Sequence, residues 1–217
     1  MAENRAEAAN VHITVADKVI EAFRSTGREI NVKQDYQLTA EDMEDPEIEL
    51  ILSLGGDGTF LKTASMIKNS KMPILGVNTD PQRSVGCLCN RKVYHDTYEA
   101  DINKMMRYIE RENFEYFMRQ RLLFEMDNAV TGTTHRQYSL NEIFVAEENV
   151  SQTSIFRLKV DDEFAGKFKS SGLIIATGTG STGWLYSAKR FTELDVTRAL
   201  SNLGAHSEPE AVSQHLA

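Results

Sequence analysis

The residues best suited to chemistry lie in a glycine-rich turn, Gly55-Gly56-Asp57-Gly58-Thr59. This run follows the apolar segment 48–54 and precedes a helical pattern over 60–68, so it joins a buried strand to a helix. Glycines let a backbone approach a ligand closely, and the free N–H groups at a helix N-terminus attract phosphate. The pattern therefore predicts a phosphate site formed by Gly55, Gly56, Gly58 and Thr59.

Asp57 is the one carboxylate in this turn. The helix dipole favours its ionised form, in which it can accept a proton from an attacking hydroxyl or help to hold Mg²⁺. The alternative is a tight turn in which Asp57 only caps the helix. The run has neither the Gly-Lys-Ser/Thr ending of a P-loop nor the G-x-G-x-x-G spacing of dinucleotide-binding folds.

Two later segments carry further polar groups. Asn141-Glu142 opens a stretch that continues as Ile-Phe-Val, and side chains that donate and accept suit ribose hydroxyls and an adenine edge. Segment 177–184, Thr-Gly-Thr-Gly-Ser-Thr-Gly-Trp, is a strand end turning into a helix and is rich in hydroxyl and N–H groups. The alternative for Asn141-Glu142 is a polar pair at a strand end without a binding role. The alternative for segment 177–184 is a flexible Gly/Thr loop.

In this order, the three segments resemble the NAD kinase family. 6-Phosphofructokinases and diacylglycerol-type lipid kinases share only the glycine motif. The loop 76–84, with Asn-Thr-Asp-Pro-Gln-Arg-Ser, is most similar to the mitochondrial-type NAD kinases. Gly178 stands where most of the family has proline, as it does in that subfamily. The likeness covers most of the chain, from about residue 11 to residue 188.

The resemblance implies phosphorylation of the adenosine ribose 2′-hydroxyl of NAD to give NADP, with ATP and Mg²⁺ as cofactors and Asp57 as the catalytic residue. Arg83 would neutralise an ATP phosphate, although a plain surface arginine is an equal alternative. No protein side chains are expected to form a metal site of their own. The residues implied to bind NAD are Asn78, Asn141, Glu142, Thr179, Ser181, Thr182, Trp184 and Ser187.

The element pattern predicts an α/β N-terminal lobe with a parallel sheet, followed by a β-rich C-terminal lobe, as in NAD kinase and diacylglycerol kinase-like folds. We place a nucleotide-binding lobe at 1–113, an NAD-binding lobe at 114–190 and an unassigned tail at 191–217, helical near 194–203 and polar beyond. Thr14 is expected to begin the first helix, and residues 30–32 to form a short strand. Asp161-Asp162 is expected to form a turn.

The charge and hydropathy of the chain limit the classes of partner that we expect. The chain of 217 residues has a formal charge of -8, which disfavours nucleic acid as a partner. No apolar run approaches the ~20 residues that span a bilayer, so we expect no membrane partner. Cys87 and Cys89 form a lone C-x-C pair and are interpreted as reduced thiols. The family implies small nucleotide ligands and a homo-oligomer, a homodimer at the simplest.

The two ends leave an alternative function open. By this resemblance we expect the chain to start after the family's first strand, and Lys189-Arg190 replaces the glycines that the family has after residue 188. A truncated C-terminal lobe would predict a catalytically impaired relative that binds nucleotide or modulates an oligomer. The resemblance implies a mitochondrial location, but residues 1–10 are not a transit peptide in pattern, so a cytoplasmic location stays an alternative.

Overall fold

The computed structural model describes residues 2–149 and 151–203. Its contacts divide the chain into two compact units, Met1–Leu140 and Asn141–Ala217. The lobe boundary predicted near Asn113 precedes the first antiparallel strand and remains a prediction. The predicted polar end beyond Leu203 lies outside the described residues.

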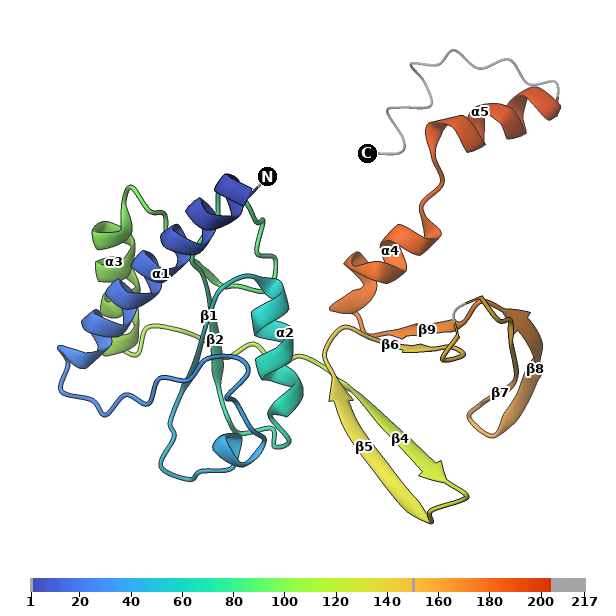
Figure 1. Ribbon diagram of the computed structural model, residues 1–217, viewed down its shortest axis with the longest axis horizontal. Helices are drawn as coiled ribbons and strands as arrows, with labels where there is room; N and C mark the ends of the chain where they lie inside the picture. The colour runs from blue at the N-terminus through green and yellow to red at the C-terminus, as the bar shows by residue number, and fades with distance from the viewer. Residues whose placement is uncertain (1, 150, 204–217) are drawn as a thin grey trace. The chain divides into compact units, whose positions relative to one another are not determined.

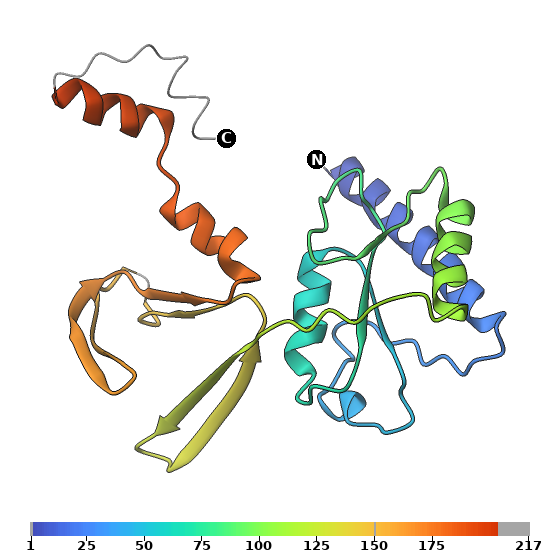
Figure 2. The same ribbon diagram turned by 180° about the vertical axis from the view of Figure 1, so that it is seen from behind.

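The first unit is a parallel three-stranded sheet between helices. Strands β1 (Ile51–Leu54), β2 (Ile74–Asn78) and β3 (Arg91–Lys92) lie in the order β1-β2-β3. Helices α1 (Ala2–Arg24) and α3 (Tyr98–Glu110) cover one face, and α2 (Asp57–Met66) covers the other (Figure 1). Seen from behind, α1 and α3 again lie side by side (Figure 2). This confirms the predicted α/β lobe with a parallel sheet.

Each face of the sheet has its own apolar core. Val15, Val19 and Phe23 of α1 pack with buried residues of α3 and with Val77 of the sheet. On the opposite face, Phe60 and Ala64 of α2 pack with Leu88 and Leu140. Burial of these side chains is the main stabilising term for the layers, at roughly 25 cal/mol per Å² of apolar surface. The cores hold the carboxyl ends of β1 and β2 side by side.

Two local expectations were wrong. The first helix begins at Ala2 and not at Thr14, because the upstream residues are rich in alanine and glutamate, which are strong helix formers. Residues 28–34 form no strand, although the Ile30 side chain packs against the core of α1 and α3. The alternation at 30–32 therefore reflects burial of one side chain and not sheet pairing.

A hairpin completes the first unit. Strands β4 (Leu122–Asn128) and β5 (Thr133–Ser139) are antiparallel, and β5 packs on α2. Just before β4, the Arg121 guanidinium donates to the carbonyls of Ala64 and Ile67 at the end of α2 and stacks on the Tyr138 ring, 4.6 Å from its centroid. A cation at this helix end satisfies free carbonyls and complements the helix dipole.

The second unit begins with two antiparallel strand pairs. Strand β6 (Glu142–Val145) pairs with β9 (Leu173–Ala176), and β7 (Ser154–Val160) pairs with β8 (Glu163–Ser170). The turn predicted at Asp161-Asp162 is confirmed: both residues have positive φ, 50° and 65°, as a tight hairpin turn requires. The antiparallel strands confirm the β-rich character predicted for this part of the chain.

Helices follow the last strand. A 3-10 turn, η2 (Gly180–Thr182), leads into α4 (Trp184–Lys189) and then α5 (Glu193–Asn202). Thr192 caps α5 by accepting the Asp195 N–H, and the Asp195 carboxylate accepts the Thr192 N–H in return, a reciprocal capping box. The helix predicted near 194–203 is therefore present. No described helix is both long enough and apolar enough to cross a membrane.

Candidate functional site

The glycine-rich turn lies at the carboxyl edge of the parallel sheet. It follows β1 directly, and the loop 79–89 follows the neighbouring strand β2. The Gly55 N–H donates to the Val77 carbonyl at 2.9 Å, which ties the start of the turn to β2. Open parallel sheets bind ligands outside the carboxyl ends of their strands, so this edge is where a ligand is expected.

Gly55 is required at its position. Its φ is 150°, and a Cβ built there would lie 2.6 Å from the Thr59 side-chain oxygen. The Thr59 side chain therefore lies over the turn, in the place that a larger residue at 55 would occupy. Gly56 precedes α2 as its N-cap, and Asp57 is the first residue of the helix. This places the free N–H groups of the helix in the turn, as the phosphate prediction requires.

The Asp57 carboxylate is oriented by two backbone donors. Oδ1 accepts the Leu88 N–H at 2.8 Å, and Oδ2 accepts the Cys87 N–H at 2.9 Å. A carboxylate has about four lone-pair positions, so each oxygen keeps capacity for a proton or a cation. Asp57 is half-buried. The two N–H groups fix the direction of the carboxylate and leave lone pairs on both oxygens free for further contacts.

Cys89 lies behind the turn. Its thiol contacts the Gly55 carbonyl at 3.6 Å, and the residue as a whole is 6 % exposed. Burial, followed by the negative charge of Asp57, raises the pKa of the Cys89 thiol to about 11. The neighbouring Cys87 is exposed. Both cysteines are free thiols, in line with the interpretation from the sequence.

Asn78 organises the loop beside the turn. It is 1 % exposed, its side-chain amide donates to the Ser84 carbonyl at 2.9 Å, and its oxygen accepts the Asp80 N–H at 3.0 Å. The Ser84 hydroxyl in turn lies 3.3 Å from where a Cβ on Gly56 would be. Asn78 therefore sets the path of a loop that packs on the glycine-rich turn.

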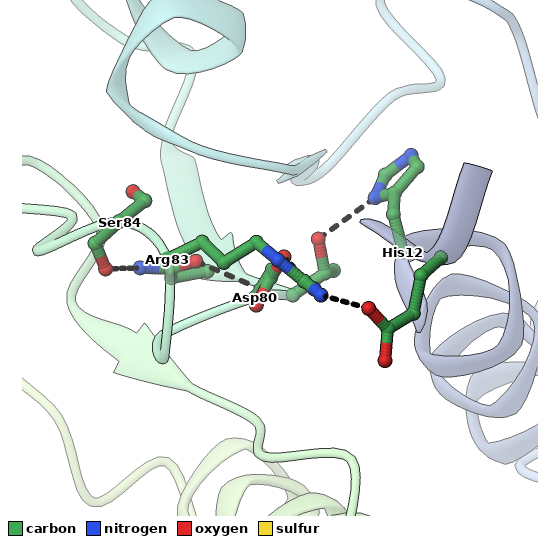
Figure 3. Close-up of polar contacts among 7 residues, drawn as sticks. His12, Asp80, Arg83 and Ser84 are labelled. Atoms are coloured by element: carbon green, nitrogen blue, oxygen red, sulfur yellow. Dashed lines mark hydrogen bonds and ion pairs between the residues drawn. The ribbon is translucent and has the colours of Figure 1, made fainter. Parts of the chain in front are cut away.

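Arg83 projects from the same loop and is engaged by two carboxylates. Its guanidinium contacts Asp80 and Glu7, each at 3.0 Å, and the nearby His12 imidazole contacts the Thr79 hydroxyl at 2.8 Å (Figure 3). Glu7 and His12 belong to α1, and sequence reasoning missed both. No local pattern could have found them, because they lie 76 and 67 positions from their partners.

In the second unit, segment 177–184 is joined to Asn141 through backbone contacts. The Asn141 carbonyl accepts both the N–H of Thr177, at 2.9 Å, and its hydroxyl, at 3.2 Å, while the Thr177 oxygen accepts the Gly180 N–H at 3.0 Å. Gly180 lies so close to the Asn141 backbone that a Cβ would clash with the Asn141 carbonyl. The two polar segments predicted from the sequence are thus adjacent.

The side chains of Asn141 and Glu142 lie beside Gly183. A Cβ on Gly183 would be 3.4 Å from the Glu142 Oε2 and 3.6 Å from the Asn141 Nδ2. The Asn141 Oδ1 is buried and has no hydrogen-bond partner among the described residues. Buried acceptors are normally satisfied, so this oxygen is a candidate to receive a hydroxyl from a ligand.

The remaining predicted residues of this unit line the turn and the helix that follows. The Trp184 ring packs against Phe144, with centroids 4.6 Å apart. The Ser181 hydroxyl donates to the Gly178 carbonyl at 2.7 Å, and the Ser187 N–H donates to the Gly183 carbonyl at 3.3 Å. Thr179 is half-buried as the N-cap of η2, and Ser181, Thr182, Trp184 and Ser187 are exposed.

Family models match both parts of the chain. The ATP-NAD kinase N-terminal domain matches residues 1–82, and the ATP-NAD kinase C-terminal domain matches residues 140–190. Among individual proteins, the chain is 28% identical to "NAD kinase 2, mitochondrial" of Homo sapiens, over 83% of this chain and 48% of that protein. It is also 28% identical to the NAD kinase of Clostridium tetani, over 79% and 59% of the respective chains.

Solved structures show the same fold. An NAD kinase from Archaeoglobus fulgidus, in complex with ATP, matches with a TM-score of 0.57 and 25% identity over 80% of this chain and 61% of that chain. Yeast NADH kinase complexed with NADH matches with a TM-score of 0.52 and 22% identity over 65% and 39%. The chain spans about half the length of the curated mitochondrial relatives that it matches. With both domain models matched and together covering more than half of its residues, the chain belongs to the NAD kinase family.

Proposed function

We propose that this chain is an NAD kinase, which transfers the γ-phosphoryl group of ATP to the 2′-hydroxyl of the adenosine ribose in NAD. The observation that carries the proposal is Asp57, a carboxylate oriented by two backbone N–H groups within a glycine-rich turn at the start of α2. Such a turn holds phosphates, and a carboxylate there is placed to act on the attacking hydroxyl. The matched family and its ATP-bound member support the choice of substrates.

The chemical step needs one proton acceptor. The ribose 2′-oxygen attacks the γ-phosphorus, a new O–P bond forms, the bond to the bridging oxygen breaks, and ADP leaves. The 2′-hydroxyl proton passes to the Asp57 carboxylate. The N–H groups of Cys87 and Leu88 keep that carboxylate in one orientation throughout. Positioning and charge stabilisation would supply most of the rate enhancement, as in other phosphoryl transfers.

Mg²⁺ fits this site as a companion of ATP. The described residues contain no group of three or more His, Cys, Asp or Glu side chains that could hold a metal alone. Mg²⁺ is commonly bound through one or two carboxylates together with substrate phosphates, and Asp57 has lone pairs left for that role. Bound with ATP, Mg²⁺ would neutralise charge that develops on the phosphate oxygens.

We assign the other predicted residues to binding. Gly55, Gly56, Gly58 and Thr59 would hold phosphates, with Arg83 offsetting their charge. For the dinucleotide, the strongest single argument is the buried Asn141 Oδ1, which has no hydrogen-bond partner in the described part of the chain, because a ribose hydroxyl can supply a donor. The residues assigned to NAD are Asn78, Asn141, Glu142, Thr179, Ser181, Thr182, Trp184 and Ser187.

Assembly and location are proposed from the relatives. We propose a homo-oligomer, with the homodimer as its simplest form, and a mitochondrial location, since mitochondrial NAD kinases are among the proteins that the chain matches. Sedimentation of the purified protein tests the first, and fractionation of source cells tests the second.

The function is tested by incubating the purified chain with ATP, Mg²⁺ and NAD. Mass spectrometry should find NAD heavier by one phosphate group, and an NADP-specific dehydrogenase should accept the product, which places the phosphate on the 2′-oxygen. Binding of ATP and NAD without any product would contradict the proposal and favour a nucleotide-binding relative without catalysis.

A further inference from the structure

Arg83 is held between carboxylates from two elements far apart in the sequence. Its Nη1 contacts the Asp80 Oδ2 and its Nη2 contacts the Glu7 Oε2, both at 3.0 Å. Asp80 belongs to the same turn as Arg83 (Figure 3), whereas Glu7 belongs to α1. The His12–Thr79 contact at 2.8 Å fixes the same helix against the same loop. The guanidinium is therefore paired with two carboxylates, one from its own loop and one from α1.

The two carboxylates are not equivalent. The Asp80 side chain is 18 % exposed, and its backbone N–H is held by Asn78, so its position is set by the loop. The Glu7 side chain is 69 % exposed and has a longer, more flexible stem. Exposed ion pairs contribute little to stability, because water solvates the separated charges well. Glu7 is thus the partner that Arg83 can exchange at little cost.

Arg83 also belongs to the loop that packs on the glycine-rich turn, in which we assign the phosphate site. Its neighbour Ser84 approaches Gly56 so closely that a Cβ there would be 3.3 Å from the Ser84 hydroxyl. A guanidinium pairs with two phosphate oxygens at once, and this geometry is as favourable as its pairing with a carboxylate. A nucleotide phosphate and the Glu7 carboxylate would therefore compete for the same N–H groups.

We propose that Glu7 sets the nucleotide affinity of this protein by competing with a phosphate group of ATP for Arg83. In the free protein Glu7 occupies the guanidinium, and Asp80 keeps it oriented. When ATP binds, its phosphate displaces Glu7, while the contact with Asp80 persists. The inference rests on the proposed function, because the competing phosphate is that of the proposed phosphate donor.

The test measures ATP binding by calorimetry for Glu7→Gln, Arg83→Ala and the double variant. Removing a weak competitor should tighten ATP binding by about threefold to fivefold, since exposed ion pairs are worth up to about 1 kcal/mol. Arg83→Ala should weaken binding by about tenfold or more, the usual scale for a charge-assisted contact. In the Arg83→Ala background, Glu7→Gln should have no further effect.

Glu21→Gln is the matched control. Glu21 lies on the same helix, its side chain is 64 % exposed, and it pairs with Lys18 at 2.9 Å, so the same charge is removed without touching Arg83. ATP affinity should stay at the wild-type value. Equal or weaker ATP binding by Glu7→Gln, or an equal gain in Glu21→Gln, would overturn the inference.

A parallel assay of NADP formation separates this inference from the proposed function. If NADP forms and Glu7→Gln leaves ATP affinity unchanged, the role of Glu7 fails and the kinase assignment stands. If the affinity pattern appears and no NADP forms, the kinase assignment fails and the role of Glu7 stands. If the wild-type chain binds no ATP, the role of Glu7 is overturned as well.

Discussion

The Asp57 carboxylate accepts the backbone N–H of Leu88 at 2.8 Å, across 31 positions of sequence. The residue proposed to act on substrate is therefore also the residue that fastens the loop 79–89 to the glycine-rich turn. Asp57 has a structural role besides the chemical one, and substitutions there should change both stability and activity.

Asp57→Ala should lower the free energy of unfolding by about 1 to 3 kcal/mol, because the buried Leu88 N–H loses its acceptor. Asp57→Asn should lose less stability than Asp57→Ala, since the asparagine side-chain oxygen can still accept one of the two N–H groups. Denaturant unfolding measures both, and amide hydrogen exchange at Leu88 should quicken in the alanine variant. The control is Asp35→Ala, which removes an exposed partner of Lys62 on α2. Equal stability losses at 57 and 35 would argue against the fastening role.

Asn141→Ala should raise the KM for NAD by about tenfold, the value of one buried hydrogen bond, and leave the KM for ATP unchanged. The reason is that the Asn141 Oδ1 has no protein partner among the described residues and is assigned to a ribose hydroxyl. Steady-state kinetics with each substrate varied in turn make the measurement. Asn149→Ala removes an exposed asparagine of the same unit whose side chain accepts the Ser151 N–H, so its two KM values should match the wild type. A higher KM for ATP in Asn141→Ala would contradict the assignment of Asn141 to NAD.

Gly180→Ala should destabilise the protein by about 1 to 3 kcal/mol, because the new methyl group would overlap the Asn141 carbonyl. It should also weaken NAD binding by displacing Asn141. Gly178→Ala is the comparison within the same loop, since a Cβ there has no atom within 4 Å. Thermal unfolding and NAD titration of the two variants should differ clearly. Similar behaviour of both would mean that the close approach at 180 has no consequence.

The raised pKa of Cys89 predicts slow alkylation and a pH-dependent stability. The folded protein holds a thiol proton up to about pH 11, whereas the unfolded chain releases it near the ordinary value of 9.0. The free energy of unfolding therefore has its full value, as far as this thiol is concerned, below the ordinary pKa, and it falls as the pH rises from that value towards the folded-state pKa. Cys87, which is exposed, should react with iodoacetamide first.

Mass spectrometry of the native protein after alkylation should find one modified cysteine, Cys87. Unfolding measured from about pH 8 upward should show a smaller alkaline loss in Cys89→Ala than in Cys87→Ser, because only the former lacks the buried thiol. Rapid modification of Cys89 in the native state would contradict its burial.

The local chemistry of the first unit could be predicted because neighbouring residues determine it. An apolar run before Gly55 and a helical pattern after it predict strand, turn and helix, and the structure has β1 and α2 in those places. The turn at Asp161-Asp162 follows from the same kind of signal. By contrast, β5 and β8 carry mainly polar or widely spaced apolar residues, and pairing with β4 and β7 defines them.

The contacts that orient the candidate site could not be predicted from local patterns. Leu88 and Cys87 hold Asp57 through backbone N–H groups, which every residue except proline carries, so their types give no signal. Glu7 reaches Arg83 across 76 positions, from the part of α1 that precedes the helix start expected at Thr14. The contacts to Asp57 and the Glu7–Arg83 contact both depend on how α1 and the loop 79–89 pack against the sheet.

The role of Asp57 is measured by transfer of labelled phosphate from [γ-³²P]ATP to NAD, with the wild-type chain and with Asp57→Asn. We expect labelled NADP from the wild type and a rate of transfer lower by about 10²- to 10⁴-fold in the variant, the usual contribution of a general base. Asp35→Asn should transfer label at the wild-type rate. Labelled NADP formed by Asp57→Asn at a near-normal rate would contradict the role of Asp57 as the proton acceptor.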